Sequence, residues 1–122
     1  MATVRYIVEN VDEAVDFYVS HLGFEVKQAW GPPFAQVERG DLELWLAGPG
    51  SSARRPMPDG AEPEPGGWNR LVIQVDDLAA TVEGLRRDGA KLRNEIVTGP
   101  GGHQILVEDP SGNCVELFQP GD

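Results

Sequence analysis

The apolar and polar positions of the first half of the chain predict a strand, a helix and three further strands. Residues 3–8 (TVRYIV) alternate in hydrophobicity and are rich in β-branched side chains, which favours a strand. Residues 11–22 (VDEAVDFYVSHL) have helical spacing, with Asn10 as N-cap and Gly23 as C-terminal cap. The helix is expected to bury Val11, Ala14, Val15, Tyr18, Val19 and Leu22. The later strands are predicted at residues 24–30, 34–39 and 42–47.

The second half repeats this order. Residues 69–75 predict a strand, Asp76 or Asp77 an N-cap, and residues 78–90 a helix. Three more strands are predicted at residues 91–97, 103–108 and 113–118. When the halves are aligned, the matching apolar pairs are Val8 with Val75, Val11 with Leu78, and Val15 with Val82. An internal duplication of a βαβββ module explains this agreement.

Residues 48–67 separate the two modules and have no periodic pattern. They are rich in glycine and proline, which is typical of a linker or a long loop. We therefore expect one domain, residues 1–122, with a first module at 1–48, a linker at 49–66 and a second module at 67–122. Arg54 and Arg55 either close over a ligand cavity or bind an anionic group, or they belong to an ordinary linker.

Composition excludes some functions. The 122 residues suffice for one domain with a core, and the formal net charge of −10 argues against a nucleic-acid partner. The charge suits a cationic small molecule, or it serves solubility alone. No apolar run of membrane-spanning length and no apolar leader is present, so no membrane partner is expected. Cys114 is the single cysteine, which excludes an internal disulfide and fits a cytoplasmic location.

Two segments carry a family resemblance: VDEAVDFYVSHLGF at residues 11–24 and EDPSGNCVELFQP at residues 108–120. With the two βαβββ modules, they make the chain similar to the vicinal oxygen chelate superfamily of glyoxalases, bleomycin-resistance proteins and dioxygenases. The resemblance implies an α+β fold with two paired modules. Their strands would form a curled, barrel-like mixed sheet with the helices outside and a ligand cavity inside. It also implies a homodimer.

The resemblance places the family's metal-ligand positions at Glu43 and Glu116 on the last strands and at Thr3 and Arg70 on the first strands. Metal-using members have histidine at the first-strand positions. A guanidinium has a positive charge and no lone pair, so we expect no metal and no cofactor. Arg70 is expected to lie between Glu43 and Glu116 and to hydrogen-bond both.

Aromatic residues extend this predicted ligand site. Trp45 lies two residues after Glu43, and Phe118 lies two residues after Glu116. Residues two apart on a strand point to the same face, so each aromatic side chain is expected on the face of its carboxylate. Trp30 and Trp68 lie where loops meet strands, and each tryptophan serves ligand stacking, the core or a dimer interface. His103 begins a strand beside a glycine-rich loop, either as an acid or base or as a rim residue.

Together, these features predict a metal-independent protein of the bleomycin-resistance type. It would sequester an aromatic or cationic natural product or drug in an aromatic and acidic cavity, which is a form of antibiotic resistance. The alternative is a glyoxalase-like lyase or isomerase, metal-free or with unusual metal ligands. A third hypothesis is an accessory domain without a ligand.

Overall fold

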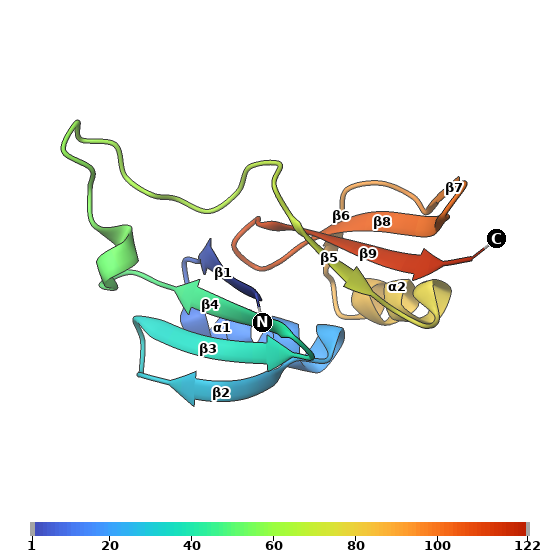
Figure 1. Cartoon of the computed structure of the whole chain (residues 1–122), viewed down its shortest axis with the longest axis horizontal. Helices are drawn as coiled ribbons and strands as arrows, with labels where there is room; N and C mark the ends of the chain where they lie inside the picture. Colours follow the sequence, from blue (N-terminus) through green and yellow to red (C-terminus); the bar gives the residue numbers. More distant parts are fainter. Residues whose placement is uncertain (1, 122) are drawn as a thin grey trace. The chain divides into compact units, whose positions relative to one another are not determined.

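Each half of the chain forms one mixed sheet and one α-helix (Figure 1). The computed structural model describes residues 2–121, and the chain divides into two units, Met1–Gly66 and Gly67–Asp122. The predicted α+β class and the repeated strand–helix–strand order are confirmed, while neither sheet closes into a barrel. None of the helices within residues 2–121 has the length and apolar character needed to cross a membrane.

The first unit has a four-stranded sheet in the order β1-β4-β3-β2. Parallel pairing joins β1 to β4, and antiparallel pairing joins β4 to β3 and β3 to β2. Strand β4 is therefore an inner strand. The elements are β1 (Ala2–Ile7), α1 (Val11–Leu22), β2 (Glu25–Ala29), β3 (Phe34–Arg39) and β4 (Leu42–Ala47).

Helix α1 has the predicted bounds because both caps form. The Asn10 side chain accepts a hydrogen bond from the Glu13 N–H at 3.0 Å, and Gly23 adopts the left-handed conformation with φ of 75°. The prediction that Val19 is buried was wrong, since this side chain is exposed. Phe17 takes its place in the core, where its ring meets Tyr18 edge-on at 5.2 Å.

The second unit has a five-stranded sheet in the order β5-β9-β8-β6, with β7 also paired to β8. Strand β9 is parallel to β5 and antiparallel to β8, so it is an inner strand. The Asp77 side chain caps the helix, accepting from the Ala80 N–H. The elements are β5 (Leu71–Gln74), α2 (Leu78–Arg87), β6 (Lys91–Leu92), β7 (Val97–Gly99), β8 (Gly102–Glu108) and β9 (Cys114–Pro120).

The single strand predicted at residues 91–97 is broken into β6 and β7. The Arg93 N–H still donates to the Leu106 carbonyl at 2.9 Å. The Leu106 N–H, however, donates to the side-chain oxygen of Asn94 at 3.0 Å instead of to a backbone carbonyl. The Asn94 side chain thus replaces one backbone hydrogen bond between the strands, and β6 ends at this point.

The turn between β8 and β9 is built around the buried carboxylate of Asp109. This carboxylate accepts hydrogen bonds from the backbone N–H groups of Ser111 and Asn113 and from the Asn113 side chain, all between 2.9 and 3.0 Å. Gly112 has φ of 87°, a conformation that side chains disfavour. The closing sequence motif therefore encodes a turn held by its own side chains.

The segment after β4 begins with a short 3₁₀ helix, Ser52–Arg54. The Arg54 guanidinium donates to the Val8 carbonyl at 3.0 Å and lies 3.6 Å from the Glu9 carboxylate. Arg54 therefore ties this segment to the end of β1.

Candidate functional site

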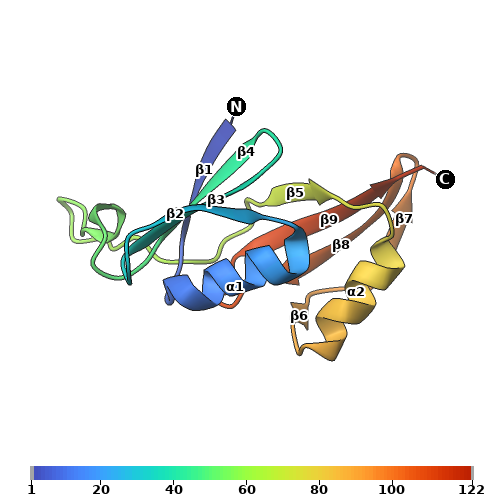
Figure 2. The ribbon, with the colours of Figure 1, turned by 90° about the horizontal axis from the view of Figure 1, so that it is seen from below.

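In the first unit, one face of the sheet packs against α1 and the other is free of helix (Figure 2). The buried residues Leu44 and Leu46 pair with Val37 and Ala35 on the helix side. Because side chains alternate along a strand, their neighbours face the opposite way. We call this opposite side the helix-free face of the first unit; from β1, β3 and β4 it carries Thr3, Arg5, Ile7, Phe34, Gln36, Glu38, Glu43, Trp45 and Ala47.

Glu43 is a buried carboxylate on this face with two hydrogen-bond donors. Lys27 Nζ donates to Oε2 at 2.9 Å, and Trp45 Nε1 donates to Oε1 at 2.7 Å. The hydrogen bond from Lys27, followed by that from Trp45, lowers the pKa of Glu43 below its usual value. The same hydrogen bond and the charge of Glu43 raise the pKa of Lys27. Glu43 is thus held as an anion by a cation.

Three aromatic rings lie together on the helix-free face, and we call Trp30, Phe34 and Trp45 the aromatic cluster. Phe34 and Trp45 meet edge-on at 5.7 Å, and Trp30 lies 5.3 Å from Phe34. The Arg5 guanidinium lies 5.0 Å from the centre of the Trp45 ring and 5.7 Å from that of Phe34. Trp30 is 47% exposed, so the cluster offers an open stacking surface.

In the second unit, Glu116 is paired with Arg70. The Arg70 Nε and Nη2 atoms donate to Glu116 Oε1 at 3.2 and 3.1 Å. The two side chains are 31% and 12% exposed, and Glu116 lies on the inner strand β9. An apolar strand can hold this carboxylate because a guanidinium accompanies it.

Glu43 has a cation within its own unit, Lys27, which the sequence analysis did not identify. The expected hydrogen bond of Arg70 to Glu43 stays a prediction. The register of β2 and β3 shifts between Val26 and Gln28, a bulge that contains Lys27. Alternation along residues 24–30 places Lys27 on the helix-free side, but the bulge that brings it to Glu43 has no clear sequence pattern.

Glu43 and Glu116 do not occupy equivalent positions in the two modules. In the first unit, Thr3 lies directly opposite Glu43. In the second unit the counterpart of Thr3 is Arg70. The residue opposite Glu116, however, is Val72, two positions further along β5. A shift of two keeps the side chain on the same face, so Arg70 reaches Glu116 along a diagonal.

These residues do not fit the metal ion that metal-using members of the resembled family bind at the corresponding positions. The Arg70 guanidinium has no lone pair, and Thr3 offers one weak hydroxyl ligand. Both carboxylates, Glu43 and Glu116, are already bonded to cations. Within residues 2–121, no group of three or more His, Cys, Asp and Glu side chains is placed to hold a metal ion.

The predicted aromatic residues of the second unit, Trp68 and Phe118, lie in two different places. The Trp68 ring is exposed, and the Arg93 guanidinium lies 4.7 Å from its centre. Arg93 also donates hydrogen bonds to Glu108 at 2.8 Å and to Cys114 Sγ at 3.3 Å. Phe118, half-buried, shares the helix-free face of this unit with Glu116. The sequence did not indicate Arg93, which lies in the break between β6 and β7.

His103 lies on the face of the sheet opposite to that of Glu116. It pairs with Gln119, whose side chain accepts a hydrogen bond from the Leu78 N–H of α2 at 2.7 Å. Its Nδ1 atom lies 3.0 Å from the Thr98 hydroxyl. His103 lines a pocket of about 290 Å³ beside the start of α2.

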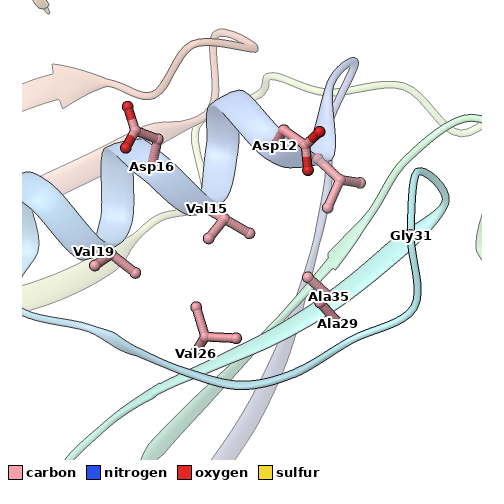
Figure 3. Close-up of a pocket in the computed structure, with 9 residues that line it drawn as sticks. Asp12, Val15, Asp16, Val19, Val26, Ala29, Gly31 and Ala35 are labelled. Carbon is pink, nitrogen blue, oxygen red and sulfur yellow. The ribbon is translucent and has the colours of Figure 1, made fainter.

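A further pocket, of about 280 Å³, opens between α1 and β2 in the first unit. Figure 3 shows Val15 and Val19 of α1 pointing toward Val26 of β2, while the Asp16 carboxylate points away. None of the predicted site residues lines it. It forms because the apolar stripe of α1 extends beyond the side chains that pack on the sheet.

Comparisons with known protein families and structures concern the chain as a whole. The family model described as Glyoxalase/Bleomycin resistance protein/Dioxygenase superfamily matches residues 1–117. No curated protein sequence is significantly similar to the chain.

Solved structures share the fold over nearly the whole chain. TnmS3, an antibiotic binding protein from Streptomyces sp. CB03234, is 26% identical, with a TM-score of 0.72 over 98% of this chain and 93% of that one. The bleomycin-binding protein of Streptomyces verticillus, complexed with copper(II)-bleomycin, is 26% identical, with a TM-score of 0.62 over 99% and 95%. A lactoylglutathione lyase from Agrobacterium tumefaciens has a TM-score of 0.75 over 98% and 92%, but its 19% identity indicates the fold alone.

Proposed function

Because the chain belongs to the glyoxalase/bleomycin resistance protein/dioxygenase superfamily, we propose that it is a metal-independent binding protein for a small natural product or drug-like molecule. The observation that carries this proposal is the aromatic cluster on the helix-free face of the first unit. Similar structures include an antibiotic-binding and a bleomycin-binding protein, which supports the same class of ligand. Binding of an antibiotic would confer resistance by sequestration.

The cluster has the properties of a stacking surface for a planar molecule. Trp45 and Phe34 come from adjacent strands of the sheet, which fixes their backbones, and Trp30 follows β2 directly. The Trp45 ring is also fixed by its hydrogen bond to Glu43. A planar ligand that covers Trp30 and Phe34 would bury apolar surface worth about 25 cal/mol per Å² without having to order these side chains first.

The lyase or isomerase alternative has less support. Glu43 and Glu116 are engaged by Lys27 and Arg70, and a carboxylate paired with a cation is a poor general base. His103, the other candidate acid or base, faces α2. The chemistry of these residues favours binding.

We further propose a cytoplasmic homodimer. Each unit has an open sheet with two edges, and an open edge exposes backbone groups that favour pairing or cover. The location rests on Cys114 being the single cysteine, which excludes an internal disulfide and suits a reducing compartment.

Tryptophan fluorescence tests the binding function. Titration with a panel of planar natural products is expected to quench Trp30 and Trp45 with a saturable curve. Trp45→Ala should weaken binding by about tenfold or more while the protein remains folded. Phe17→Leu, which alters an aromatic residue on the helix side, is the control: it should lower stability and leave affinity unchanged. Equal affinities for Trp45→Ala and the parent would refute the site.

A further inference from the structure

We propose that Arg5 makes the aromatic cluster selective for planar ligands with an anionic or hydrogen-bond-accepting oxygen, such as a carboxylate, phenolate or quinone carbonyl, and against planar cations. This inference rests on the proposed binding function and names its ligand class. It replaces the expectation of a cationic ligand that the net charge and the tryptophans suggested.

The first step concerns the position that a ligand cation would take. A cation is attracted to the face of an aromatic ring within about 6 Å of its centre. The Arg5 guanidinium already holds that position on both Trp45 and Phe34, at 5.0 and 5.7 Å. A cationic ligand would meet a fixed positive charge at these two rings, and Coulomb repulsion opposes its binding.

The second step concerns the hydrogen-bonding groups of Arg5. A guanidinium has five N–H donors and no acceptor. The Arg5 side chain is exposed, and among residues 2–121 it contacts the Trp45 and Phe34 rings and makes no ion pair or hydrogen bond. Its donors are therefore available to an oxygen at the edge of a stacked ligand, and such charge-assisted hydrogen bonds are strong and directional.

The third step concerns the negative charges on the same face. Glu43 and Glu38 lie opposite each other, in the row of residues next to that of Arg5 and Trp45. Two residues along a strand span about 7 Å. Lys27 lies 2.9 Å from Glu43 and is also within electrostatic range of Glu38. Glu25 of β2 pairs with Glu38 and extends this acidic row, and Lys27 offsets one of its negative charges. The charge that lies directly over the Trp45 and Phe34 rings is that of Arg5.

Two probes with the same ring system test this selectivity: acridine-9-carboxylate, an anion, and 9-aminoacridine, a cation at neutral pH. Equilibrium dialysis would measure both dissociation constants at about 150 mM salt, where the Debye length of about 8 Å screens the net charge of −10. The variants are Arg5→Gln, Arg5→Lys and the control Arg87→Gln, which removes an equal charge from an exposed side chain of α2.

We expect the parent to bind the carboxylate at least about tenfold more tightly than the amine, the difference that one charge-assisted hydrogen bond supplies. Arg5→Gln should abolish this preference, Arg5→Lys should keep part of it, and Arg87→Gln should match the parent. If both acridines bind and Arg5→Gln leaves their ratio unchanged, this inference is wrong and the binding function stands. If neither acridine binds, the proposed function at this face is overturned together with it.

Discussion

Replacing Arg70 by alanine would leave the Glu116 carboxylate on an inner strand without its cation. The Glu116 side chain is 12% exposed, and the Arg70 guanidinium supplies two of its hydrogen bonds. A charged group that loses its partner in such a place keeps the cost of its desolvation. We therefore expect Arg70→Ala to lower the free energy of unfolding.

The structure sets the size of the loss. At 3.1 Å and an effective dielectric constant of about 20, the direct attraction is about 5 kcal/mol. Losing one partner of a fully buried pair costs roughly 3–5 kcal/mol, and an exposed pair contributes at most about 1 kcal/mol. Because the Arg70 side chain is 31% exposed, water can enter when it is removed. We expect a loss of about 2 kcal/mol, between these two limits.

Urea titrations followed by tryptophan fluorescence would measure this loss. The matched control is Arg86→Ala: its guanidinium lies at the same 3.1 Å from Glu95, but those side chains are 53% and 88% exposed. The control should change stability by at most about 0.5 kcal/mol. The double variant Arg70→Ala with Glu116→Gln should recover much of the loss, because the amide carries no charge.

The comparison with the parent at neutral pH decides the question. If Arg70→Ala unfolds at the same urea concentration as the parent, the Arg70–Glu116 pair is not a stabilising element and the reasoning fails.

Three further predictions follow from the site. Lys27→Met should raise the pKa of Glu43 toward its usual value of 4.5, which carboxyl ¹³C NMR would measure. A carboxyl group whose pKa is lowered in the folded state stabilises the protein above pH 4.5, and this contribution is lost as the pH falls. The variant should therefore lose less stability than the parent on acidification below pH 4.5. An unchanged Glu43 titration would contradict the role given to Lys27. Elemental analysis after mild purification should find far less than one Zn, Fe, Mn or Ni per chain, and near one would overturn metal independence. Sedimentation equilibrium at micromolar concentration should show twice 13.3 kDa, whereas a monomer would exclude the homodimer.

The sequence predicted the parts of the fold that depend on local chemistry. Helix α1 has the expected bounds because Asn10 and Gly23 determine its ends locally. The strand at residues 91–97 was mispredicted because its break depends on Asn94, whose side chain bonds to the distant Leu106. Likewise, helical spacing does not show where a sheet ends, so it placed Val19 in the core.

Some contacts of the candidate site were predictable from the sequence, and others were not. The family resemblance placed Arg70 at a metal-ligand position, and the need of a buried carboxylate for a cation then predicted its contact with Glu116. The same argument required a cation for Glu43 without identifying Lys27, which reaches it across a bulge. Arg5 was not recognised because alternation predicts which face a residue lies on, but not that its guanidinium lies over Trp45.

The turn held by Asp109 also constrains how this protein can change its length during evolution. Asn113 closes the turn directly before β9, so the number of residues in the turn determines which side chains of β9 point toward α2. Inserting or deleting one residue there would reverse that choice: Glu116 would enter the core, and Val115 and Leu117 would turn outward. A new binding chemistry can therefore arise by replacing Phe118 and the other side chains of β9 that face away from α2, whereas the length of the turn is fixed by the need to bury Val115 and Leu117.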